Sequence, residues 1–180
     1  GFTDVMLEGL DGTLTENMDN DLRLIQKNGQ HLLHLINDVL DMAKIESGRM
    51  NLHPETFKVH DILDEVTSIT STLASAKNLA LFIDESSDPE IEIYADNARL
   101  RQVMINIINN SIKFTDQVKV AIRVARDENN VRISVKDTGI GVAPEDHERI
   151  FERFHTTGDT KLHSTSKTAY RGGGLGLGLA

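Results

Sequence analysis

Residues 99–115 read RLRQVMINIINNSIKFT, and this stretch predicts an amphipathic helix with a polar site on one face. Asn106 and Asn110 are four residues apart, so their side chains lie next to each other on a helix. Two amide oxygens in this arrangement can bind one hard cation, and Lys113 on the same flank offers a positive charge to a phosphate group. The stretch therefore predicts a site for magnesium and phosphate.

The segment 137–141, Asp-Thr-Gly-Ile-Gly, follows an alternating run that predicts a strand. The Asp137 carboxylate can accept a hydrogen bond from the exocyclic amine of a base, and Gly139 and Gly141 let the backbone approach a planar base closely. Taken alone, the segment is explained equally well as an Asp-Gly turn that ends a strand. Together with the helix at 99–115, it predicts a nucleotide site in which one element recognises the base and the other binds phosphate.

A glycine-rich segment near the end of the chain predicts further phosphate contacts, made by backbone N–H groups. Its glycines are Gly172, Gly173, Gly174, Gly176 and Gly178. A flexible linker is the alternative, but linkers are polar, whereas Leu175, Leu177 and Leu179 alternate with these glycines. Ser, Thr, Lys and Gly dominate residues 156–168, so we expect a mobile loop there that acts as a lid.

The composition excludes several classes of function. The 180 residues carry 19 Lys and Arg against 28 Asp and Glu, a net charge of −9 that argues against nucleic-acid binding. There is no cysteine, which excludes disulfides and cysteine nucleophiles and fits a cytoplasmic location. No apolar run approaches the roughly 20 residues that span a bilayer. We expect no membrane contact from this piece, which leaves open an anchor elsewhere in the parent protein.

Residues 21–45 carry apolar side chains at alternating spacings of three and four, the pattern of a bundle or coiled-coil helix. These side chains are Leu22, Ile25, Leu32, Ile36, Val39 and Ala43. A helix that packs only on its own domain is the alternative, but the length of the segment favours a dimerising helix. Ser47 and Gly48 predict its end, and residues 9–20 predict a loop from an earlier helix. We expect residues 1–50 to form part of a helical dimerisation hairpin, cut within its first helix.

Residues 51–180 mix helices and strands. The expected strands are 56–59, 79–84, 91–94, 118–126 and 131–136, and the expected helices are 60–77 and 99–115. Asp96 is a suitable N-cap for the second helix, and residues 127–130 predict the turn of an antiparallel hairpin. This arrangement predicts a two-layer α/β sandwich with its helices on one face of the sheet.

Four segments, in this order, resemble the sequence boxes of the ATP-binding catalytic domain of sensor histidine kinases, within the GHKL family that also holds gyrase, Hsp90 and MutL ATPases. Residues 99–115 resemble the N box, 137–141 the G1 box, 150–154 the F box and 173–180 the G2 box. The resemblance implies a Bergerat-type α/β fold for residues 51–180. Residues 32–41, LLHLINDVLD, resemble the second helix of the kinase dimerisation hairpin, which implies a homodimer.

The resemblance also implies the residues that contact Mg²⁺ and ATP. Asn106 and Asn110 would bind the metal ion, Lys113 would contact a phosphate, and Asp137 would hold the adenine amino group. The full set of implied ATP-binding residues is Asn106, Asn110, Lys113, Phe114, Asp137, Gly139, Ile140, Gly141, Arg153, Phe154, Gly174, Leu175, Gly176, Leu177 and Gly178.

Some of these residues would surround the base or belong to the lid. Phe114 and Ile140 would form the walls of the base site. Phe151 and Phe154 would anchor the lid, and Arg153 would reach the phosphates. For the two lid phenylalanines, simple packing in the core is compatible with that role.

The residue at position 106 separates a kinase from a hydrolase. Hydrolytic members of the wider family resemble one another in having a glutamate one turn before the metal-binding asparagine, where this chain has Asn106. A carboxamide cannot act as a general base, so an ATPase of the gyrase and Hsp90 kind is disfavoured. Phosphoryl transfer to a separate nucleophile is favoured instead.

The acceptor of that phosphoryl group is not found in the sequence. The acceptor box of such kinases resembles His-Glu-Leu-Arg-Thr-Pro, and none of the seven histidines lies in such a string. We expect the acceptor upstream of Gly1, so that this fragment binds ATP but does not phosphorylate its own chain. The implied function is transfer of the ATP γ-phosphoryl group to a histidine, for relay to an aspartate in a response regulator receiver domain. The alternative is a nucleotide-regulated dimerisation module without catalysis.

Overall fold

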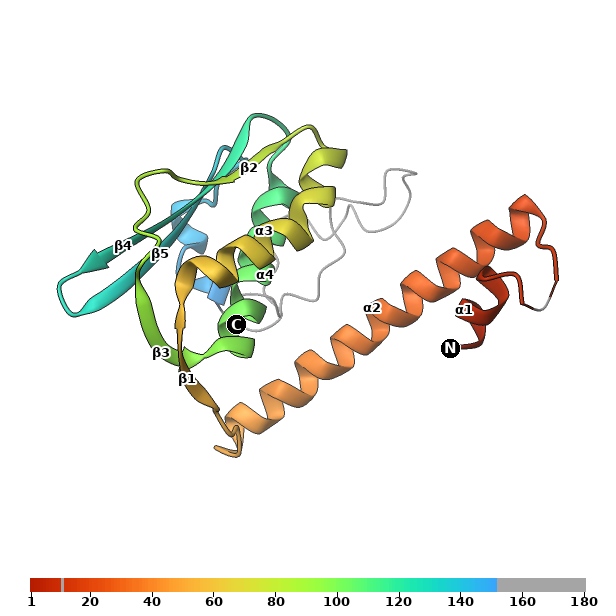
Figure 1. Ribbon diagram of the computed structural model, residues 1–180, viewed down its shortest axis with the longest axis horizontal. Helices are drawn as coiled ribbons and strands as arrows, with labels where there is room; N and C mark the ends of the chain where they lie inside the picture. The colour runs from red at the N-terminus through yellow and green to blue at the C-terminus, as the bar shows by residue number, and fades with distance from the viewer. Residues whose placement is uncertain (11, 152–180) are drawn as a thin grey trace. The chain divides into compact units, whose positions relative to one another are not determined.

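The computed structural model describes residues 1–10 and 12–151, and the chain divides into two compact units, Gly1–Asn51 and Leu52–Ala180 (Figure 1). The first unit consists of α1 (Phe2–Leu7) and α2 (Glu16–Glu46). Both helices were expected, but the prediction of a loop through residue 20 is wrong. Thr15 caps the second helix, because its hydroxyl accepts a hydrogen bond from the backbone N–H of Met18 at 3.3 Å, and the helix therefore begins at Glu16.

The end of α2 follows the prediction. The Ser47 N–H donates to the carbonyl of Ala43, and Gly48 has a φ of +65°, the left-handed conformation that commonly ends a helix. Along the helix, the residues Leu32, Ile36 and Val39 are about half exposed, at 58%, 46% and 50%. The apolar stripe is therefore only partly covered by the residues around it.

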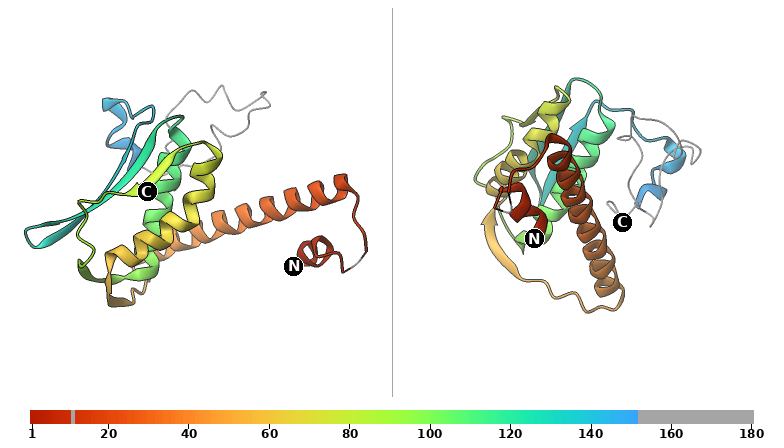
Figure 2. Two further views of the ribbon diagram at one scale, coloured as in Figure 1. Left: turned by 45° about the horizontal axis from the view of Figure 1, so that its top comes forward. Right: turned by 90° about the vertical axis from the view of Figure 1, so that its right-hand side faces the viewer.

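The second unit has two layers, in which helices cover one face of a sheet (Figures 1 and 2). The helices are α3 (Val59–Ala76) and α4 (Asn97–Phe114). The main sheet contains β2 (Ala80–Ile83), β4 (Lys119–Asp127) and β5 (Asn130–Asp137), in the order β2-β4-β5. The predicted α/β sandwich is confirmed.

The sequence predicted a single sheet, but the strands form two separate sheets. β1 (Pro54–Lys58) and β3 (Glu92–Asp96) pair only with each other, antiparallel, as a separate ribbon. β2 runs parallel to β4, and β4 pairs antiparallel with β5 through the expected tight turn. The two short helical turns η1 (Pro144–Asp146) and η2 (Arg149–Phe151) follow β5.

The core lies between the helices and the main sheet. Alternate residues of β4 are buried against the helices, as the period of two in a strand requires. The largest fully buried side chains of the core are Val59, Ile62, Leu63, Val66, Ile91, Ile108, Val120, Ile122 and Val124. This packing fixes which face of α4 turns away from the core.

Asp96 caps α4, as predicted, and also holds the segment that enters the second unit. Its Oδ1 accepts a hydrogen bond from the N–H of Arg99 at 3.1 Å, and its Oδ2 accepts one from the N–H of His53 at 2.9 Å. The bond from His53, followed by that from Arg99, lowers the pKa of the Asp96 carboxyl below its ordinary value. The start of α4 is therefore tied to a residue at the beginning of the second unit.

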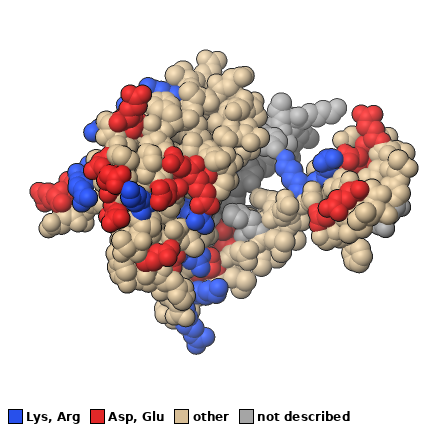
Figure 3. Space-filling model, viewed as in Figure 1, with Lys and Arg blue, Asp and Glu red and all other residues tan. Residues whose placement is uncertain are grey.

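On the face of the second unit seen in Figure 3, acidic and basic side chains are interspersed. Among the helices of the described residues, none combines the length and apolarity needed to cross a membrane.

Candidate functional site

α4 brings three of the predicted site residues to one side of the second unit. Met104, Ile108 and Ile112 are buried in the core, so the opposite side of the helix carries Asn106, Asn110 and Lys113. All three polar side chains are partly buried. Within residues 1–10 and 12–151, no side-chain hydrogen bond occupies either asparagine amide. The two amides can therefore accept a ligand without first losing a partner in the described chain.

Lys113 and Phe114 contact each other at the end of this helix. The Lys113 Nζ atom lies 5.0 Å from the centroid of the Phe114 ring, within the range of a cation–π interaction. Such contacts contribute only about 0.5–1 kcal/mol at exposed sites. A phosphate group can therefore compete with the ring for this ammonium group.

The turn after β5 fixes the Asp137 side chain. Asp137 is opposite the buried Val120 in the strand register, at the end of the sheet. Its Oδ1 accepts a hydrogen bond from the N–H of Gly139 at 2.9 Å, which holds the carboxylate in one orientation. Within the described ranges the second oxygen, Oδ2, accepts no hydrogen bond, so it is able to accept one from a base, and the side chain is exposed.

This turn packs directly against the end of α4. The Ile140 N–H donates to the Phe114 carbonyl at 3.2 Å. A Cβ atom at Gly139 would lie 2.5 Å from the Phe114 carbonyl oxygen and 2.9 Å from Thr115 Oγ1, so no other residue fits without movement of the backbone. The hydroxyl of Thr138 adds a hydrogen bond to the Gln117 carbonyl at 2.8 Å.

Two segments far apart in the sequence thus pack against each other, and both carry residues of the predicted site. Asn110 and Asn106 lie one and two turns before Phe114, about 6 and 12 Å along the helix axis. Next to the Asp137 carboxylate, Phe114 and Ile140 are 38% and 79% exposed. This part of the surface therefore has a carboxylate, apolar side chains and the Lys113 ammonium group at one end, and the two amides farther along α4.

The oxygen atoms on α4 suit magnesium in type but are too few to bind it alone. The described residues contain no group of three or more His, Cys, Asp and Glu side chains that could hold a metal ion. The amide oxygens of Asn106 and Asn110 are hard ligands that suit Mg²⁺. Two such oxygens do not fill an octahedral shell, so the residues fit an ion that also binds substrate phosphates and water.

Part of the predicted site lies outside the described residues. These positions are Arg153, Phe154, Gly174, Leu175, Gly176, Leu177 and Gly178, together with the expected lid at 156–168. Of the F-box residues, Phe151 is described and is 61% exposed. Gly141, the last residue of the turn, has a φ of +72°, a conformation that favours glycine.

Two residues near the site were not singled out from the sequence. Thr138 joins the turn to the loop after α4, and Lys77 donates from its side chain to backbone carbonyls at the end of α4. A threonine in a turn and a lysine at a helix end are common features, so no local signal distinguished them. Their partners are 21 and 35 residues away in the sequence, and only the fold brings them together.

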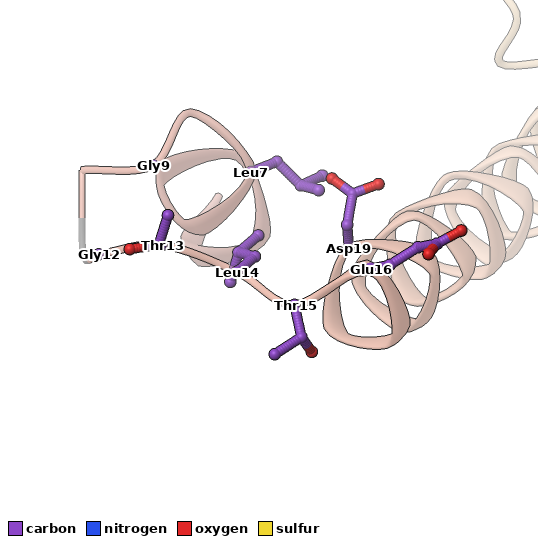
Figure 4. A pocket seen from close by; sticks show the side chains of 8 residues that line it. All are labelled: Leu7, Gly9, Gly12, Thr13, Leu14, Thr15, Glu16 and Asp19. Carbon is purple, nitrogen blue, oxygen red and sulfur yellow. The ribbon is translucent and has the colours of Figure 1, made fainter.

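Two surface depressions are lined by other residues. One is at the loop between α1 and α2, where Leu7, Leu14 and Thr15 lie near the acidic Glu16 and Asp19 (Figure 4). It carries no basic side chain that could attract a phosphate. The other lies between β3 and β5, and its lining includes Tyr94, Leu100 and Val131. Neither depression includes a predicted site residue.

Comparisons with family models match both units. Residues 95–180 match the model described as "Histidine kinase-, DNA gyrase B-, and HSP90-like ATPase", and residues 1–48 match the "His Kinase A (phospho-acceptor) domain". The first match includes α4 and the turn at 137–141, which form the site described above. The second includes α2.

Several curated proteins are similar over almost the whole chain. The non-motile and phage-resistance protein of Caulobacter vibrioides is 38% identical, over 99% of this chain and 21% of its own length. The circadian input-output histidine kinase CikA of Synechococcus elongatus and the signal transduction histidine-protein kinase BarA of Escherichia coli are each 32% identical over 99% of this chain, and are covered over 23% and 19% of their lengths. The chain thus spans about a fifth of these relatives.

The chain is also similar to solved structures. Full-length ShkA in complex with AMPPNP has a TM-score of 0.76 and 32% identity, with 98% of this chain and 35% of that chain covered. The catalytic domain of histidine kinase ThkA has a TM-score of 0.56 and 27% identity, with 59% of this chain and 73% of that chain covered. The likeness to ShkA includes both units, whereas that to ThkA covers a smaller part of the chain.

Proposed function

The chain belongs to the sensor histidine kinase family, and from this membership we propose that it binds ATP with magnesium and donates the γ-phosphoryl group to a histidine. The observation that carries the proposal is the junction of α4 with the turn at 137–141. The hydrogen bond from Ile140 to Phe114 and the close approach of Gly139 to the same carbonyl join the turn that bears Asp137 to α4, which supports the proposal. Full-length ShkA, a similar structure, was solved with AMPPNP.

The base would bind at the turn. Asp137 Oδ1 is held by Gly139, so Oδ2 would accept the hydrogen bond from the adenine amino group. The exposed side chains of Phe114 and Ile140 would cover the two faces of the ring and lose water-accessible apolar surface. The carboxylate gives selectivity for an amino group over a carbonyl at that position of the purine, because a carboxylate only accepts hydrogen bonds.

The phosphates would bind along α4. Asn106 and Asn110 would hold the magnesium ion, which supplies neutralisation of phosphate charge when it is bound. The Lys113 ammonium group would exchange its contact with the Phe114 ring for a phosphate oxygen. We propose that Arg153 and the segment from Gly174 to Gly178 add contacts to the nucleotide.

The chemistry is transfer and not hydrolysis. The amide of Asn106 has no proton-accepting site near neutral pH, so it cannot activate water. Catalysis would come mainly from positioning and charge neutralisation. The names of the relatives favour a kinase over a dimerisation module without catalysis.

The acceptor would be a histidine outside these 180 residues, because none of the seven histidines here lies in a string that resembles His-Glu-Leu-Arg-Thr-Pro. The phosphoryl group would then pass to an aspartate of a response regulator receiver domain. Homodimerisation would use the half-exposed apolar stripe of α2, since burying Leu32, Ile36 and Val39 against a second copy removes apolar surface from water. We propose a cytoplasmic location for this piece.

The test uses the full chain with Mg²⁺, γ-labelled ATP and a separate helical hairpin that carries an acceptor histidine. The proposal expects acid-labile, base-stable label on the hairpin, as phosphohistidine gives. The Asp137→Ala variant serves as the matched control and should give little label. Tight binding of ATP without transfer to any hairpin tested would contradict the kinase function.

A further inference from the structure

The Lys77 side chain donates hydrogen bonds to backbone carbonyls at the end of α4, although Lys77 itself lies at the end of α3. Its ammonium group donates three hydrogen bonds to backbone carbonyls, to Ile112 at 2.7 Å, Lys113 at 2.7 Å and Thr115 at 3.1 Å. An ammonium group has three donors, so its hydrogen-bonding capacity is fully used. In the described chain, Lys77 takes part in no ion pair. Its charge is therefore directed at the end of α4.

This contact replaces a common type of helix ending. The last carbonyls of an α-helix have no partner within the helix, and many helices end at a glycine that satisfies them. α4 ends instead at Thr115, whose backbone is extended, with φ −104° and ψ 126°. The carbonyls of Ile112 and Lys113 are satisfied by Lys77, and that of Phe114 by the N–H of Ile140. A cation at this end also opposes the partial negative charge of the helix dipole.

Lys77 is itself held firmly. It caps the C-terminus of α3, where its N–H donates to the Ala74 carbonyl at 3.0 Å. Asn78 follows with a φ of +55°, which turns the chain into β2. The ammonium group thus projects from a backbone position that is fixed by both a helix end and a strand start.

The loop after α4 is hydrogen-bonded to two other segments of the chain. The Ala80 N–H donates to the Val118 carbonyl at 3.0 Å, next to the Lys77 contact with Thr115. On the other side, the Thr138 hydroxyl donates to the Gln117 carbonyl at 2.8 Å. The connection between α3 and β2 therefore holds the same loop that the turn of Asp137 rests on.

From these contacts we infer that Lys77 is a positioning residue of the nucleotide site, which sets the end of α4 and, through Phe114 and Ile140, the turn that bears Asp137. The inference rests on the proposed function, because it assigns to Lys77 an effect on nucleotide binding. Lys77 touches neither base nor phosphate in this role. Its removal leaves carbonyls of the last helical turn without partners, and this turn bears Lys113 and Phe114.

The experiment compares Lys77→Met with Lys58→Met in the full chain. Methionine keeps the apolar stem of Lys77 and removes its donors. Lys58 pairs with Glu90 at 2.8 Å on the surface, and such exposed pairs contribute little, so Lys58→Met controls for the loss of one positive charge. The readouts are the affinity for AMPPNP with magnesium, by calorimetry, and amide hydrogen exchange along the chain.

For Lys77→Met we expect affinity weaker by about fivefold or more, and faster exchange at the Ile140 N–H relative to the β4 core. Lys58→Met should change neither. Partial recovery in Lys77→Arg, which keeps the charge but not three donors on one nitrogen, is also expected. Unchanged affinity in folded Lys77→Met, or a rise in exchange that is uniform over β4 and the turn, would overturn the inference.

Two further outcomes are decisive. If Lys77→Met does not fold, Lys77→Gln takes its place, because its amide can still donate to two carbonyls. A smaller loss of affinity with faster exchange at Ile140 would then support the inference, and no change in either would overturn it. If the unmodified chain does not bind AMPPNP, the proposed function fails, whereas the exchange of Ile140 still decides whether Lys77 positions the turn.

Discussion

Replacing Gly139 by alanine is expected to separate the turn at 137–141 from α4. The new Cβ atom would lie 2.5 Å from the Phe114 carbonyl oxygen, 2.9 Å from Thr115 Oγ1 and 3.0 Å from Asp137 Oδ1. A carbon–oxygen contact is normally about 3.3 Å or longer, so the turn and the helix must move apart by about 0.8 Å. The closest atom belongs to the backbone, which cannot rotate away as a side chain can.

The expected cost follows from the contacts that this movement breaks. Overpacking of a well-packed site typically costs about 1–3 kcal/mol. Loss of the Ile140–Phe114 hydrogen bond adds about 1 kcal/mol. We therefore expect the free energy of unfolding to fall by about 2–4 kcal/mol, and the affinity for AMPPNP to fall by about tenfold or more because Asp137 moves with the turn.

Urea unfolding followed by circular dichroism gives the first quantity, and calorimetry gives the second. Gly141→Ala is the matched control, because Gly141 has a φ of +72° and, among the described residues, no neighbouring atom within 4 Å of the added Cβ. Its free energy of unfolding should fall only by about 1–2 kcal/mol, the cost of holding alanine in a left-handed conformation. If Gly139→Ala is no less stable than Gly141→Ala and binds AMPPNP with unchanged affinity, the contact between the turn and α4 is not what builds the site.

Three further predictions concern the base, the dimer and the cap of α4. Asp137→Ala should weaken ATP binding by about tenfold, because hydrogen bonds to charged groups contribute about 1.5–3 kcal/mol, and calorimetry showing equal affinity would refute this. Ile36→Lys should abolish dimerisation, since it puts a charge into the apolar stripe of α2; a variant that is still dimeric by light scattering would count against the bundle. The lowered pKa of Asp96 stabilises the folded state above the ordinary aspartate pKa of about 3.9, and this stabilisation is lost as the pH falls further, through the folded pKa. Asp96→Asn should therefore be less stable at neutral pH and lose less stability on acidification from pH about 5 to about 3, measured by urea unfolding; equal pH dependence in both proteins would contradict the capping role.

Local signals in the sequence were sufficient for the elements that build the site. The cap at Asp96 and the period of apolar residues predicted α4, and alternation predicted β4 and β5 with the tight turn between them. The meeting of α4 with the turn at 137–141 was expected only because both segments suited one nucleotide. The structure supplies its physical basis, the hydrogen bond from Ile140 to Phe114.

Other features depend on contacts that no local pattern reveals. The start of α2 has no clear local signal, because the residues after Thr15 are mostly polar and hide the first turn of an exposed helix. The separate pairing of β1 with β3 depends on partners about 40 residues apart. The role of Lys77 likewise has no local signal, since its three acceptors lie on another helix and the loop after it.

The central claim is that two amides and one carboxylate grip a single nucleotide. A crystal structure of the chain with AMPPNP and Mn²⁺ in place of Mg²⁺ tests it most directly, because the anomalous signal of manganese locates the ion. We predict the ion at the amide oxygens of Asn106 and Asn110, and the adenine amino group at Asp137 Oδ2. A purine bound elsewhere, or an ion that touches neither amide, would contradict the account.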